Sequence, residues 1–243
     1  MCGQRRIRSD DLSTRRFFHD WLNEVSSLQT HFKTLRTLRG MLIPGWLTTE
    51  YLKGKRQSYL NPFKVYLVCA AFFFVSAPVA GFRLTSLIES DRSRTVARLA
   101  SARVPDGDPG RPLFNARFDV RVQSVYTIAV GAVAIIFALM LQILFRKQSQ
   151  LYGAHLIFAL HYVAFMYLLT IAVGASRRLG VSSDTAAAVG YAVLTPYLIV
   201  ALKPVYSEPT GVILMKAGAL ILLIIVLNGF ANFAAIRLTL SLA

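Results

Sequence analysis

Apolar residues are gathered into five runs along this chain of 243 residues, and polar and basic segments separate the runs. A hydrocarbon core of about 30 Å is crossed by roughly 20 helical residues, and each run has that length or nearly so. The runs are Pro62–Phe82, Ser124–Phe145, Tyr152–Ala175, Ala186–Leu202 and Gly211–Ala235. None alternates apolar and polar residues as a barrel strand does. The pattern predicts an all-α membrane protein with about five transmembrane helices within residues 62–243.

The fourth run is the weakest of the five, because it is short, rich in alanine and interrupted by Pro196. If it did not cross the membrane, four transmembrane helices would remain, and the C-terminus would lie on the same side of the membrane as the N-terminus.

A different periodicity precedes the first run. Apolar residues there recur at steps of three and four, as on one face of a helix. They are Phe18, Trp21, Leu22, Val25, Leu28, Phe32, Leu35, Leu38 and Leu42, and Pro44-Gly45 follows them. Basic residues lie among the polar positions, which suits a helix in the headgroup plane of an anionic leaflet. A helix packed on the rest of the protein or on a second copy has the same pattern, so both interpretations stay open.

A second short helix is predicted from Trp46 or Leu47 to Tyr59, where the chain turns into the first run. Asn61 can cap a helix with its side-chain oxygen, and Pro62 suits a first turn because it has no amide hydrogen to satisfy. Residues 13–61 are therefore predicted to form an amphipathic, interfacial pair of helices, after a basic tail at residues 1–12.

Charge sets the expected orientation. Residues 1–64 carry 12 Lys and Arg against five Asp and Glu, and the whole chain has a net charge of +15. Basic residues beside a first span hold that side in the cytoplasm, so the N-terminus is predicted inside and, after five spans, the C-terminus outside. Because the charge lies mainly at membrane flanks, it does not predict nucleic-acid binding. The two cysteines, Cys2 and Cys69, make no disulfide framework.

Polar residues within the runs are the candidates for chemistry in the membrane. His155 and His161 lie in the third run, about 120° apart around a helix, so they do not share a face. Asn228 and Asn232 in the fifth run are four residues apart and do. Hydrogen bonding between helices is the ordinary role of such groups; a transport path lined by His161, Asn228 and Asn232 is the alternative. No catalytic motif is present, so we expect a protein that is not an enzyme and has no cofactor.

The residues before the first run occur in a specific order: Pro44-Gly45, Glu50-Tyr51-Leu52, Gly54-Lys55-Arg56, Tyr59-Leu60 and Pro62. This order resembles a bacterial membrane family, the domain of unknown function numbered 3667. The resemblance covers roughly residues 30–75. Members of that family often begin with a zinc ribbon, of which Cys2-Gly3-Gln4 looks like the last fragment. The resemblance implies that zinc would bind only if further cysteines preceded Met1, since a structural site needs four ligands.

These observations favour a scaffold or regulatory protein of the bacterial inner membrane, with a basic cytoplasmic head that docks on anionic lipid headgroups. A second copy or another membrane protein is the alternative partner for the head. Arg56 is expected to hold a phosphate or carboxylate bidentately. The candidate binding residues are Lys53, Gly54, Lys55, Arg56, Tyr59 and Pro62.

Overall fold

The fold is that of a computed structural model, which describes residues 28–79, 98, 101–105, 107–148 and 151–242. Those residues are helical or lie in turns, and no strand occurs among them. The predictions for the N-terminal tail, for Cys2 and for the start of the amphipathic stripe fall on residues 1–27, outside the described residues. The all-α membrane fold is confirmed.

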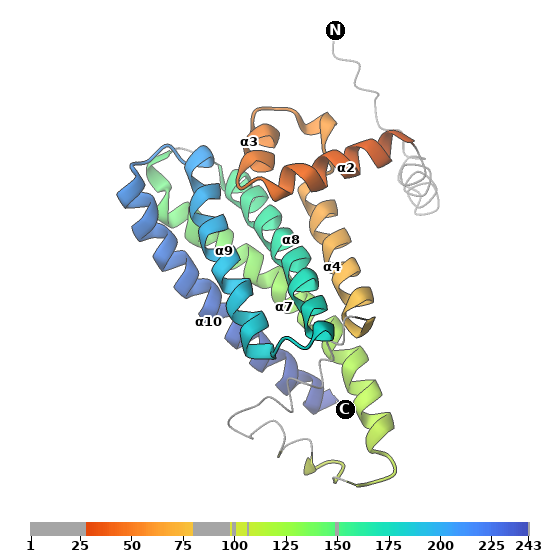
Figure 1. The fold of residues 1–243 in the computed structure, drawn as a ribbon. Helices are drawn as coiled ribbons and strands as arrows, with labels where there is room; N and C mark the ends of the chain where they lie inside the picture. The colour runs from red at the N-terminus through yellow and green to blue at the C-terminus, as the bar shows by residue number, and fades with distance from the viewer. Residues whose placement is uncertain (1–27, 80–97, 99–100, 106, 149–150, 243) are drawn as a thin grey trace, which may run out of the picture.

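Five long helices form the body of the molecule (Figure 1). They are α4 (Pro62–Val79), α7 (Arg111–Leu144), α8 (Tyr152–Ser176), α9 (Ser183–Val205) and α10 (Thr210–Leu242). α7 begins 13 residues before the apolar run that predicted it, and α9 and α10 extend beyond theirs. An apolar run marks only the residues suited to hydrocarbon, whereas backbone hydrogen bonding continues through the polar flanks.

Four helices of the described chain are long and apolar enough to cross a membrane, at Arg56–Ser76, Tyr152–Ser176, Asp184–Val205 and Thr210–Thr239. The fourth predicted span, the weakest in the sequence, is one of them despite Pro196 inside α9. In α7, the apolar stretch of the described residues is the shorter Gly131–Leu144.

α8 lies at the centre of the body, where it packs on α4, α7 and α9, while α10 packs on α7 and α9. One face of α8 joins α4 through aromatic rings, including Tyr167 against Tyr66 and Phe73. The other face meets α7, where Phe158 and Tyr162 lie against Phe137. α8 is thus packed on both faces, and the N-terminal segment attaches to it.

The helices alternate in direction, so the two ends of the body differ (Figure 1). The α7–α8 connection with η3 (Arg146–Gln148) and the α9–α10 connection lie at the end that carries α2 and α3, and the C-terminus lies at the other. This is the alternation that the predicted topology requires. A cytoplasmic N-terminus itself stays a prediction.

The segment before α4, which we call the head, comprises α2 (Leu28–Leu42), α3 (Trp46–Leu52) and η2 (Arg56–Ser58). The prediction that the second helix continues to Tyr59 is wrong, because α3 ends at Leu52. The predicted start of α4 is confirmed: Asn61 Oδ1 accepts a hydrogen bond from the Phe63 amide at 2.9 Å, and Pro62 is the first helical residue.

Candidate functional site

Gly54 ends α3, and this explains its place in the basic motif. Its φ angle is +94°, in the left-handed region that glycine adopts without strain. The Lys55 amide donates to the Glu50 carbonyl and the Gly54 amide to the Tyr51 carbonyl, each at 3.2 Å. This pair of bonds is the Schellman arrangement, which satisfies the last carbonyls of a helix. A Cβ on Gly54 would meet no atom within 4 Å, so the glycine serves the turn and not a close approach.

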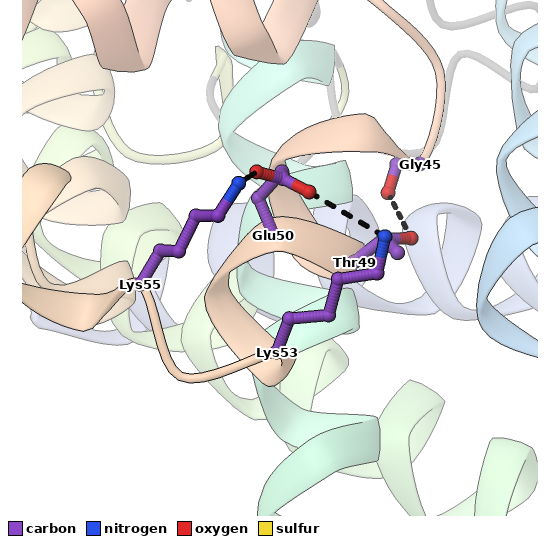
Figure 2. Close-up of polar contacts among 5 residues, drawn as sticks. All are labelled: Gly45, Thr49, Glu50, Lys53 and Lys55. Atoms are coloured by element: carbon purple, nitrogen blue, oxygen red, sulfur yellow. Dashed lines mark hydrogen bonds and ion pairs between the residues drawn. The ribbon is translucent and has the colours of Figure 1, made fainter.

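The turn brings two lysines of the predicted binding motif onto one carboxylate of their own chain (Figure 2). Lys55 pairs with Glu50 Oε2, and Lys53 Nζ lies 3.5 Å from Glu50 Oε1. The side chain of Glu50 is only 10% exposed, whereas those of Lys53 and Lys55 are 63% and 57% exposed. The hydrogen bond from Lys55 lowers the pKa of Glu50, and the same bond raises the pKa of Lys55. The two lysines therefore neutralise a buried acid while their other hydrogens face outward.

Arg56 is exposed, and its guanidinium carbon lies 5.9 Å from the centre of the Tyr51 ring. The lysines hold Glu50, so that carboxylate is not the partner of Arg56. Tyr59 is buried with its ring edge-on to Trp46, at 5.8 Å between centroids. Of the predicted binding residues, Tyr59 and Pro62 are buried, whereas Arg56 is exposed and pairs with no carboxylate among the described residues. Its binding of a phosphate stays a prediction.

α3 is held tightly against the transmembrane body. Gly45, before α3, has a φ angle of +72°, and a Cβ there would lie 2.4 Å from the Ala201 carbonyl oxygen of α9. Thr48 Oγ1 and His161 Nδ1 of α8 share a buried hydrogen bond of 3.0 Å. Tyr51 lies edge-on to the His161 ring, at 6.1 Å between centroids. α3 is therefore a helix packed on the transmembrane body.

Polar groups hold α2 in place, both within the head and against the body. The Leu60 amide donates to Thr37 Oγ1 at 3.1 Å, and Thr37 Oγ1 donates to the Lys33 carbonyl at 2.7 Å. The Tyr197 hydroxyl of α9 donates to the Met41 carbonyl at 2.6 Å. Thr37 and Met41 are both buried. The face of α2 that contacts the protein is therefore centred on Thr37 and Met41.

The predicted apolar stripe of α2 points the other way. Phe32, Leu35 and Leu42 are 74%, 59% and 64% exposed, respectively. At 100° per residue, these three positions lie on the side of the helix opposite Thr37. Within the described chain this apolar face is left largely uncovered, and whether lipid or a second copy covers it stays a prediction.

A groove with a volume of about 380 Å³ runs along this exposed face. Its lining is apolar except for two arginines. It consists of Phe32, Leu35, Arg36, Arg39, Gly40, Ile43 and Trp46. A Cβ on Gly40 would lie 2.7 Å from the Trp46 ring, so the glycine lets the ring lie directly on α2. Within the described chain, no carboxylate pairs with Arg36 or Arg39.

The intramembrane polar candidates are not joined to one another. His155 Nδ1 bonds the Tyr206 hydroxyl at 2.7 Å, whereas His161 faces α3, as their 120° separation predicts. Asn228 donates to the Ile224 carbonyl of its own helix at 3.0 Å. The side chain of Asn232 lies outside the described residues. No hydrogen bond joins His161 to Asn228 in the described chain, and the transport alternative gains no support.

Three buried polar residues are not among the site residues predicted from the sequence. Thr37, Thr48 and Glu50 carry contacts of the head, and of these only Glu50 is among the residues that carry the family resemblance. All three lie within the segment that the resemblance covers, which is the one signal in the sequence that includes them. Among the described residues, no three His, Cys, Asp or Glu side chains could hold a metal ion together.

The fold and the head define the class: a multi-helix membrane protein with a basic N-terminal head packed on its helices. Comparison with known families narrows this further. Residues 33–74 match the model of a family described as "Protein of unknown function (DUF3667)", which confirms the resemblance over α3, η2 and most of α2 and α4. No curated protein and no solved structure matches the chain.

Proposed function

We propose that this membrane protein acts as a scaffold or regulatory protein whose head docks α2 on the anionic cytoplasmic surface of the membrane. The observation that carries the proposal is the orientation of α2: Thr37 and Met41 face the protein, and Phe32, Leu35 and Leu42 face away. A soluble helix would bury the opposite face. An interfacial helix places apolar residues in the acyl boundary and basic residues at the headgroups.

The expected gain is large enough to hold the helix at the surface. Full burial of a Phe or Leu side chain stabilises by about 1.5–3 kcal/mol, and α2 offers three of them. Basic residues beside an anionic surface add about 1 kcal/mol each. Arg36 and Arg39 are exposed, as are Lys53, Lys55 and Arg56 on the adjoining turn. The basic motif and the apolar face of α2 therefore act on the same leaflet. The role of the head in this proposal is binding and not catalysis.

Hydrogen exchange of the full chain in lipid nanodiscs tests the proposal. We expect α2 amides to exchange more slowly in discs that contain phosphatidylglycerol than in discs of phosphatidylcholine alone, and high salt to reduce the difference. Replacing Phe32, Leu35 and Leu42 together by Ser removes the apolar face and should abolish the protection. The packed helix α3 is the internal control, because its exchange should not depend on lipid charge. Equal exchange of α2 in both lipids contradicts the proposal.

A further inference from the structure

The groove on α2 combines features that an interfacial helix does not need. Adsorption requires apolar side chains that point into the lipid, but not a hollow. Here the Trp46 ring folds back onto Gly40 and forms one wall, and Phe32, Leu35 and Ile43 continue the apolar lining. The volume of about 380 Å³ is at the small end of the range for small-molecule sites, about 300–1,000 Å³. Such a groove holds a slender apolar group, such as part of one acyl chain.

Among the described residues, no acid balances the charge of the two arginines of the groove. Arg36 and Arg39 are three residues apart, so they are neighbours on one face of the helix and repel each other. The described helix, Leu28–Leu42, contains no acidic residue that could offset them. Elsewhere in the head, the buried acid Glu50 has its own lysines. An anion bound between the guanidinium groups would remove the repulsion and accept charge-assisted hydrogen bonds.

We propose that this groove is a binding site for a single anionic phospholipid, with an acyl chain against Trp46 and Ile43 and the phosphate on Arg36 and Arg39. The inference deepens the proposed function, on which it rests, by naming the ligand that the head selects. A phospholipid has an apolar chain joined to an anion, which matches the lining of the groove. In a protein whose helices cross a membrane, it is also the ligand present at the highest local concentration.

Native tryptophan fluorescence offers a direct test. The chain contains two tryptophans, so Trp21→Phe leaves Trp46, in the wall of the groove, as the only one. The purified full-length variant in mild detergent is titrated with phosphatidylglycerol or phosphatidylcholine that carries bromine on the acyl chain, which quenches tryptophan on contact. We expect half-maximal quenching at a mole fraction of phosphatidylglycerol at least tenfold lower than that of phosphatidylcholine.

Charge variants show whether the arginines make the selection. Arg36→Gln with Arg39→Gln should bring the two lipids within about twofold of each other. Arg146→Gln with Lys147→Gln is the matched control, because it removes two exposed charges from η3 at the same end of the body and should preserve the tenfold preference. Retention of the preference by the first variant, or its loss from the control, overturns the proposal. Unchanged thermal midpoints verify that both variants are folded.

Other occupants give different results, and each overturns the proposal. Quenching that develops only after residues 1–27 are deleted means that the chain's own N-terminal segment fills the groove. No quenching, together with a dimeric mass that Ile43→Asp reduces to a monomer, means that a second copy covers it. The docking of α2 is tested separately: exchange that depends on anionic lipid without selectivity at Trp46 refutes the groove alone. Exchange that does not depend on lipid charge refutes the docking.

Discussion

Replacing Gly45 by Ala should loosen the head from the transmembrane body. Two separate penalties apply at this position. A residue with a Cβ in the left-handed region loses about 1–2 kcal/mol relative to glycine, and the φ angle of Gly45 is +72°. The new Cβ would also lie 2.4 Å from the Ala201 carbonyl oxygen and 2.7 Å from Pro204 Cγ, both in α9. Because helix backbone cannot move aside as a flexible side chain does, α3 must shift, and overpacking of this kind costs about 1–3 kcal/mol.

Gly54→Ala is the matched control, since it carries only the first penalty. Its φ angle is +94°, and no atom lies within 4 Å of a Cβ built there. We therefore expect a total loss of about 2–5 kcal/mol for Gly45→Ala, but only about 1–2 kcal/mol for Gly54→Ala. Gly54→Asn should be milder still, because Asn tolerates the left-handed region.

The thermal midpoint of the detergent-solubilised protein, followed by the fraction that remains monodisperse after heating, measures the difference. A loss of 1 kcal/mol corresponds to a drop of about 2–4 °C for a chain of this size. The midpoint of Gly45→Ala should thus fall clearly below that of Gly54→Ala. Equal midpoints for the two variants would refute the close packing of α3 on α9.

Four further single variants and one double variant test the remaining contacts of the head and the start of α4. Glu50→Gln should lower the thermal midpoint at neutral pH. The pKa of Glu50 in the folded chain lies below its usual 4.5. The difference in midpoint between variant and native chain should therefore persist above about pH 5 and vanish as the pH falls through the folded pKa. Asn61→Ala should lower stability by about 1 kcal/mol through loss of the α4 cap, measured as a midpoint shift. Thr48→Val and His161→Phe should each destabilise by about 1–2 kcal/mol, and their double variant by clearly less than the sum; strict additivity would disprove the hydrogen bond.

Local chemistry explains what the sequence predicts well. The long helices follow from apolar runs whose length matches a membrane, and the start of α4 follows from Asn61 and Pro62, whose capping preferences need no distant partner. The sequence also contains a signal for the end of α3, because glycine is the preferred residue just after a helix. The predicted helix instead continues through Gly54 to Tyr59, which puts the basic motif on a helix rather than on a turn.

Contacts between distant segments could not be predicted from the sequence. Thr48 and His161 are 113 residues apart, and nothing near Thr48 indicates a histidine partner. The apolar stripe of α2 was correctly located, but periodicity is the same whether a stripe faces the protein, a second copy or lipid. The direction was decided by two hydrogen bonds, those of Thr37 and of the Met41 carbonyl. Neither hydrogen bond can be predicted from the hydrophobic pattern.

The depth of position 32 in the membrane is the most direct test of the docked head. Phe32→Trp, in a chain with Trp21→Phe and Trp46→Phe, places a single fluorophore at the most exposed of the described apolar positions of α2, 74% exposed. In anionic nanodiscs, lipids brominated near the top of the acyl chain should quench it, and aqueous iodide should have little effect. The same fluorophore at Gln57, an exposed position of η2, should show weaker quenching by lipid and stronger quenching by iodide. Strong iodide quenching at position 32 with none from any brominated lipid would contradict the account.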